Sequence, residues 1–269
     1  MSALPVLLGL GGPLQYQQVP HAGLPYIEKS RREVAFYPGG KLELTLALPG
    51  DVMISGWDRP VVLVEMEKII YRLPEDEARS LASRHPLQVR HTQTLATVRV
   101  AAPAMVPANI EVNLTVRVPK QRTDLKLTLR KGDLRLQEIN GWIEATLPEG
   151  SMEIRSVSGY FSGITRLGDI EADLSGKRWE GFGFTAVTHN GKVLLRLPAQ
   201  YSAALQLQTE EGAISIDYPE QLVEGEAIPL AAVAKKKARS LSATVSEGGA
   251  PVRLMTMRGD VRLESKPEP

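Results

Sequence analysis

Glycine recurs every nine residues in the middle of this 269-residue chain, between residues 130 and 174. Two positions after each glycine stands an apolar residue, and four positions after it stands an apolar or small one. This alternation predicts short strands with one buried face, and glycine lets the backbone turn between strands at positive φ. The five glycines are Gly132, Gly141, Gly150, Gly159 and Gly168.

The same unit recurs outside that run, after Gly50, Gly191, Gly212 and Gly259. A period that does not drift favours strands stacked along an axis, because one such unit cannot bury its apolar face alone. We therefore predict an all-β fold, a β-solenoid-like or β-helix-like stack in which two or three nine-residue arms make one coil. An antiparallel meander is the alternative, since strands at 8–12-residue spacing are also typical of sandwiches and barrels.

The remaining sequence predicts how the chain is organised around this stack. Residues 1–35 are rich in Pro and Gly at first and show no period, so we expect a loosely structured arm. Residues 36–265 form the single predicted domain, and 266–269 form a tail. A short helix is expected at 75–84, because Pro74 and three acidic residues suit a helix N-terminus.

Two segments interrupt the glycine pattern and are predicted to be inserted loops. They lie near 176–183 and 224–240, and the second contains the basic run "KKKAR". We interpret this run as a solvated loop rather than a site for a polyanion or a membrane surface. Loops inserted into a rigid scaffold often carry function.

Composition excludes several classes of function. With no cysteine, the chain has no disulfide and no thiolate metal site. The 32 Lys and Arg residues balance 31 Asp and Glu, which argues against a broad nucleic-acid-binding face. The four histidines lack zinc-ligand spacing, and the repeats lack the G-G-x-G-x-D pattern of calcium-binding nonapeptides. We therefore predict no catalytic residue, no metal and no cofactor.

Two sequence features bear on the location of the protein, namely its apolar runs and its N-terminal stretch. No apolar run approaches the length that a bilayer requires, so no transmembrane segment is predicted. The opening "MSALPVLLGLGGP" lacks a basic n-region and is interrupted by Pro5 and Gly9. It is therefore not a convincing signal peptide.

Three aromatic residues are the candidates for contact with a ligand or partner. Trp142 and Tyr160 lie eighteen residues apart, so they stack on an outer corner if two arms make one coil. There they would face a sugar ring or pack beneath a neighbouring segment. Trp179 lies in the first inserted loop, and we expect it to be the most exposed tryptophan and the best partner contact.

A column of charged residues follows from the same spacing. Arg135, Glu153 and Glu171 are eighteen residues apart and would point outward together. Such a column could hold the carboxylate pair of a carbohydrate-active enzyme. A solvated salt-bridge ladder is the favoured interpretation, because charge runs on a surface are usually of this kind.

Several stretches of the chain resemble a bacterial family of unknown function known as "putative adhesin". They are "GDVMISGWDRPVVLVE", "VNLTVRVPK", the run "GDLRL…NGWIEA…GSMEI" and "NGKVLLRLPAQYSAALQLQTEEGAISID", and the likeness extends over about Phe36 to Ser265. The resemblance implies a β-solenoid-like or β-helix-like fold and a cell-envelope or extracellular location. The family has no settled catalytic residues to carry over.

Three hypotheses of function follow. The leading one is a non-enzymatic, cell-envelope or surface-associated scaffold or binding protein of adhesin-like type. Its partner would be another protein, a glycan or an envelope component, and nucleic acid is not expected. The alternatives are a carbohydrate-active enzyme on the same scaffold and a structural protein that self-assembles through the ends of the stack.

Overall fold

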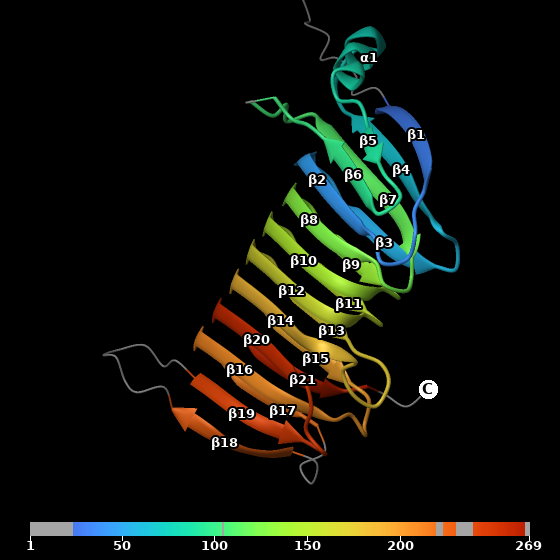
Figure 1. Ribbon diagram of the computed structural model, residues 1–269. Helices are drawn as coiled ribbons and strands as arrows, with labels where there is room; N and C mark the ends of the chain where they lie inside the picture. Colours follow the sequence, from blue (N-terminus) through green and yellow to red (C-terminus); the bar gives the residue numbers. More distant parts are fainter. Residues whose placement is uncertain (1–23, 104, 219–222, 230–238, 267–269) are drawn as a thin grey trace, which may run out of the picture.

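The computed structural model describes residues 24–103, 105–218, 223–229 and 239–266. Within them the chain forms two large sheets and one short helix, α1 (Glu75–Ser83), which confirms the all-β class and the predicted helix (Figure 1). Neither sheet closes on itself.

The ten-stranded sheet has the order β1 (Tyr26–Ala35), β4 (Val61–Ile70), β7 (Ile110–Pro119), β3 (Val52–Trp57), β9 (Leu134–Gln137), β11 (Met152–Arg155), β13 (Ile170–Asp173), β15 (Val193–Leu197), β21 (Val261–Ser265) and β17 (Ile214–Asp217). The eleven-stranded sheet has the order β18 (Val223–Pro229), β19 (Arg239–Val245), β16 (Ala203–Glu211), β20 (Pro251–Arg258), β14 (Gly181–Asn190), β12 (Ser158–Leu167), β10 (Asn140–Glu149), β8 (Asp124–Lys131), β2 (Lys41–Pro49), β6 (Leu95–Val100) and β5 (Gln88–His91).

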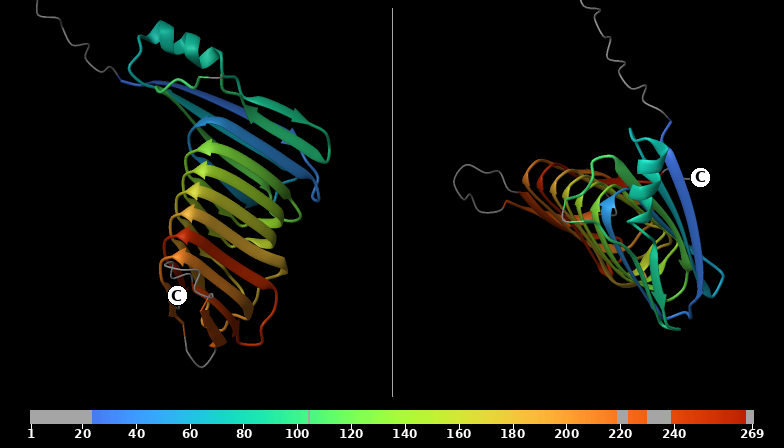
Figure 2. Two further views of the ribbon diagram at one scale, coloured as in Figure 1. Left: turned by 90° about the vertical axis from the view of Figure 1, so that its left-hand side faces the viewer. Right: turned by 90° about the horizontal axis from the view of Figure 1, so that it is seen from above.

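In the repeat region the chain alternates between the two sheets. A long strand in the eleven-stranded sheet is followed by a short strand in the ten-stranded sheet, and we call this pair a rung (Figure 2). Strands of neighbouring rungs pair in parallel with a step of eighteen residues, as in Asn140 with Ser158 and Met152 with Ile170. Two nine-residue units therefore make one rung, and an antiparallel meander is excluded for this run.

The core lies between the two sheets. The residues two and four positions after the five glycines of the 132–168 run point into it, and Ile143, Met152, Ile154 and Phe161 are fully buried there. After Gly212 the pattern fails, because Ile214 is half-buried and Ile216 is exposed. Phe161 also stacks on Phe184 of the next rung, with ring centroids 4.8 Å apart. Burial of this apolar column along the whole stack is the main stabilising term, because no rung encloses its own core.

Close approach of the backbone explains the glycine period. Gly150 lies at the corner between the long strand and the short strand of its rung. A Cβ on Gly150 would lie 1.9 Å from the carbonyl oxygen of Gly132, and φ of Gly150 is +139°. Gly141 belongs to a second column at the start of the long strands. A Cβ there would lie 2.0 Å from the carbonyl oxygen of Thr123. Glycine is thus required for rung-to-rung contact as well as for the turn predicted from the sequence.

The N-terminal end of the stack departs from the repeat. Strands β1, β4 and β7 pair antiparallel, and α1 packs beside β1 and β4. The buried Lys68 ammonium donates to the carbonyl oxygen of Ala82 at 2.8 Å and pairs with Glu28 of β1, which fastens the helix to the sheet. Tyr26–Ala35 was predicted within the loose arm and instead forms β1, because it pairs with β4 along its full length. Residues 1–23 lie outside the described part.

The C-terminal strands do not lie in chain order. Rung β20–β21 lies between rungs β14–β15 and β16–β17, with parallel neighbours on both sides (Figure 1). The hairpin of β18 and β19 extends the eleven-stranded sheet beyond β16. The predicted loop near 224–240 falls partly outside the described residues, and Val223–Pro229 and Arg239–Val245 are the strands of this hairpin.

Candidate binding surface

An aromatic cluster lies on the outer face of the eleven-stranded sheet, and it consists of Trp142, Tyr160 and Phe182. Trp142 of β10 and Tyr160 of β12 are neighbours in the parallel register. Their rings stack with centroids 3.9 Å apart and planes inclined by 24°. The stacking predicted from the eighteen-residue spacing is confirmed. Trp142 is 44% exposed, so the pair reaches the surface rather than lying beneath another segment.

Phe182 is the member of the cluster that the sequence analysis did not identify. It lies at a β-bulge, because Gly159 pairs with Gly181 while Tyr160 pairs with Gly183. The extra residue is 78% exposed, and its ring centroid lies 6.2 Å from that of Trp142. Bulges re-aim side chains in this way. The sequence feature that could have identified Phe182 is the pair Gly181 and Gly183 on either side of it, which breaks the nine-residue period.

Two carboxylates hold Trp142 in place. Its indole Nε1 donates to Glu144 Oε1 at 2.9 Å, and its backbone N–H donates to Asp124 Oδ1 at 2.8 Å. Asp124 belongs to β8, the next strand of the sheet. The ring is therefore fixed from its own strand and from the neighbouring one, which lowers the entropy lost when a ligand binds.

Trp179 does not fit its predicted role. The prediction that it is exposed is wrong, because its side chain is only 4% exposed. Its ring packs edge-on against Phe184, and its indole Nε1 donates to the carbonyl oxygen of Gly159 at 3.0 Å. The segment between β13 and β14 folds this ring into the core, where its apolar area is buried and its N–H is satisfied.

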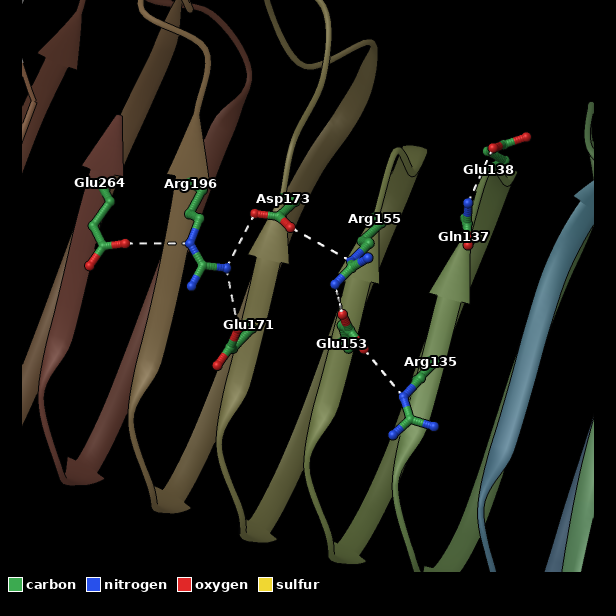
Figure 3. A network of polar contacts seen from close by, with 9 residues as sticks. All are labelled: Arg135, Gln137, Glu138, Glu153, Arg155, Glu171, Asp173, Arg196 and Glu264. Atoms are coloured by element: carbon green, nitrogen blue, oxygen red, sulfur yellow. Dashed lines mark hydrogen bonds and ion pairs between the residues drawn. The ribbon is translucent and has the colours of Figure 1, made fainter. Parts of the chain in front are cut away.

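The charged column on the opposite sheet is an ion-pair ladder (Figure 3). Arg135 lies 3.3 Å from Glu153, and Arg196 lies 3.2 Å from Glu171. Arg155 pairs with Glu153 and Asp173, and Arg196 pairs also with Asp173 and Glu264. The favoured interpretation of Arg135, Glu153 and Glu171 is thus confirmed. Each carboxylate already faces a guanidinium, so the enzyme hypothesis loses its candidate acid–base pair.

The aspartates that follow the corner glycines have a structural role. Asp133 Oδ1 accepts the backbone N–H of Ser151 at 3.0 Å, and Asp51 Oδ1 accepts that of Asp133 at 2.8 Å. Asp169 does the same for Lys192 at 2.7 Å. Each carboxylate satisfies a backbone donor of the neighbouring rung. In the part of the chain that the structure describes, no group of three or more His, Asp or Glu could hold a metal ion.

Proteins similar to this chain are found among solved structures. No family model and no curated protein matches the chain. Among solved structures, it is similar to a "putative cell adhesion protein" from Clostridium sporogenes, with 13% identity, a TM-score of 0.45, and coverage of 89% of this chain and 100% of that one. A "putative adhesin" from Bacteroides fragilis matches with 11% identity, a TM-score of 0.27, and coverage of 89% and 97%. A "putative lipid binding protein" from Parabacteroides distasonis matches with 8% identity, a TM-score of 0.26, and coverage of 87% and 96%.

These TM-scores are all low, so the names of the neighbours carry no argument about the activity of this chain. Within the described residues, no helix has the length and apolar character needed to cross a membrane.

Proposed function

We propose that the chain is a non-enzymatic scaffold or binding protein of the cell envelope or cell surface, adhesin-like in type. Its framework would be an open β-solenoid-like stack with two nine-residue arms per coil, and its contact surface would be the aromatic cluster. The exposed cluster carries the proposal, because three contacting aromatic rings on a regular sheet face expose apolar area that a partner would cover.

The surroundings of the cluster support a binding role. Trp142 is oriented by hydrogen bonds from two strands, and Phe182 is turned outward by a bulge. Parallel pairing fixes the strands beneath them. Such a surface binds without rearrangement, which suits a protein whose partner is a glycan, another protein or an envelope component. The resemblance of the sequence to an envelope-associated family supports the proposed location.

The self-assembly hypothesis has less support. The strand that ends the ten-stranded sheet at the N-terminal side is β1, and it carries Glu28, Lys29, Arg31, Arg32 and Glu33. Charged side chains on an edge strand are a common protection against pairing with another copy. Light scattering after size-exclusion chromatography over a concentration series tests this, and we expect no growth of the particle with concentration.

Co-sedimentation with isolated bacterial cell envelopes tests the proposed function. We compare the wild type with a variant that combines Trp142→Ala, Tyr160→Ala and Phe182→Ala. The matched control combines Ile164→Ala and Leu167→Ala, which are 46% and 41% exposed on β12 of the same sheet. The proposal predicts that the wild type and the control sediment and that the aromatic variant stays in solution. Equal sedimentation of all three proteins, or of none, would contradict it.

A further inference from the structure

The Trp142 residue is 44% exposed, and among the described residues its ring partners come from β12 and β14. Tyr160 of β12 covers one face of the indole at a centroid distance of 3.9 Å, and Phe182 of β14 lies at 6.2 Å. On the side away from Tyr160, the next strand is β8, which places the short side chain of Asp124 at this step of the register. A short side chain does not cover an indole ring. The open face is therefore a platform on which a flat apolar surface can stack.

The two carboxylates beside this platform each keep an unused acceptor. Asp124 uses Oδ1 for the backbone N–H of Trp142, and Glu144 uses Oε1 for the indole N–H. Neither Asp124 Oδ2 nor Glu144 Oε2 accepts a hydrogen bond from any residue that the structure describes. Ionised carboxylates only accept hydrogen bonds. A ligand on the platform must therefore present donors at its rim.

Two lysines lie on the strands beside the carboxylates of the platform. Lys126 of β8 faces Glu144 in the parallel register, and Lys41 of β2 faces Asp124. Lys41 itself pairs with Glu43 at 2.9 Å, so the two lysines lie among three carboxylates and compensate only part of their charge. A ligand ammonium or guanidinium group would have to compete with these lysines, whereas a hydroxyl group would not.

We propose that the open face of Trp142, with Asp124 and Glu144 at its edge, binds a neutral sugar ring. The apolar face of the ring would stack on the indole, and two of its hydroxyl groups would donate to Asp124 Oδ2 and Glu144 Oε2. Hydrogen bonds from a neutral donor to an ionised acceptor are stronger than neutral pairs. This inference rests on the proposed function, for which it names the class of ligand.

Isothermal titration calorimetry on the full chain tests the site. The probes are soluble neutral hexasaccharides of glucose with β-1,4 and α-1,4 links, of mannose, and of N-acetylglucosamine. Hexagalacturonate and tetramethylammonium serve as the anionic and cationic probes. The variants are Trp142→Ala and Asp124→Asn, and Ile164→Ala is the control on the same sheet face. Asparagine keeps the acceptor for the Trp142 backbone N–H and replaces the spare oxygen by a donor.

We expect at least one neutral hexasaccharide to bind the wild type. Its affinity should fall about tenfold or more in Trp142→Ala, which removes the stacking platform. It should fall about threefold or more in Asp124→Asn and change less than about twofold in Ile164→Ala. Circular dichroism of each variant establishes that a lost affinity is not lost folding.

Three results would overturn the inference: no heat with any neutral probe up to about 10 mM, tighter binding of tetramethylammonium or hexagalacturonate than of every neutral probe, or equal affinity in the wild type and Trp142→Ala. These outcomes are separable from failure of the proposed function. If envelopes still sediment the wild type but not the aromatic variant, the contact surface stands and only the sugar site is wrong.

Discussion

Substitution of a corner glycine by alanine tests the close backbone contact between neighbouring rungs. At Gly150 a Cβ would lie 1.9 Å from the carbonyl oxygen of Gly132, and real Cβ contacts below 3.0 Å essentially do not occur. The two rungs must therefore separate by about 1 Å. Between them run the hydrogen bonds from Gly132 to Glu149 and from Leu134 to Ser151, both 2.9 Å long. Such a shift breaks or badly strains both bonds.

The expected loss of unfolding free energy in Gly150→Ala has two contributions, the clash between rungs and the positive φ. Two further variants each carry only one of them. Two lost backbone hydrogen bonds cost about 1–3 kcal/mol, and an L-residue at this positive φ costs about 1–2 kcal/mol more. Gly150→Ala should therefore lower the free energy of unfolding by about 2–5 kcal/mol. Gly141→Ala carries the clash, with 2.0 Å to Thr123 O, but no positive φ. Gly39→Ala carries a φ of +91° with nothing within 4 Å.

Urea unfolding followed by far-ultraviolet circular dichroism measures all three variants. We expect Gly39→Ala to cost about 1–2 kcal/mol, Gly141→Ala about 1–3 kcal/mol, and Gly150→Ala the most. The reasoning is refuted if Gly150→Ala is no more destabilising than Gly39→Ala. In that case the glycines would serve only their turns, and the close contact between rungs would not exist in solution.

Three further predictions concern individual side chains. Trp179→Phe should destabilise the fold by about 1–3 kcal/mol, because the carbonyl of Gly159 loses its indole donor. The variant should bind envelopes as the wild type does. A loss of binding in the folded variant would show that the contact surface lies elsewhere. Tyr201→Phe should be neutral or stabilising by about 1 kcal/mol, since the buried hydroxyl has no partner among the described residues. Tyr218→Phe should cost about 1–3 kcal/mol, because the Tyr218 hydroxyl donates to the carbonyl oxygen of Pro198 and accepts the backbone N–H of Tyr201. Urea unfolding midpoints in the reverse order would contradict this pair of predictions. The hydrogen bond from Lys41 lowers the pKa of the Glu43 carboxyl. The small contribution of this pair to stability is therefore complete at neutral pH and is lost as the pH falls through the lowered pKa. Carboxyl NMR titration should give Glu43 a midpoint below about 4.3 that rises in Lys41→Ala, and an unchanged midpoint in that variant would exclude the pair.

The sequence predicted what depends on local spacing. The glycine period predicted strands with one buried face, and the eighteen-residue spacing placed Tyr160 beside Trp142 and Glu153 beside Arg135. These relations survive because parallel stacking converts sequence distance directly into position along the sheet.

Features that depend on pairing between distant segments were not predictable in this way. Every rung has the same corner glycine, so Gly259 and Gly212 look alike in the sequence, and nothing local places rung β20–β21 before β16–β17. Trp179 was misplaced for a related reason. Its burial depends on Phe184 and on the carbonyl of Gly159, twenty residues away, rather than on the polar loop in which it stands.

Hydrogen–deuterium exchange with and without isolated cell envelopes tests the central claim most directly. The account predicts slower exchange in the first residues of β10, β12 and β14, where the aromatic cluster and its bulge lie, with no change on the ion-pair ladder of the opposite sheet. Protection confined to that ladder or to β1, or no protection in any segment, would contradict a binding surface at Trp142, Tyr160 and Phe182.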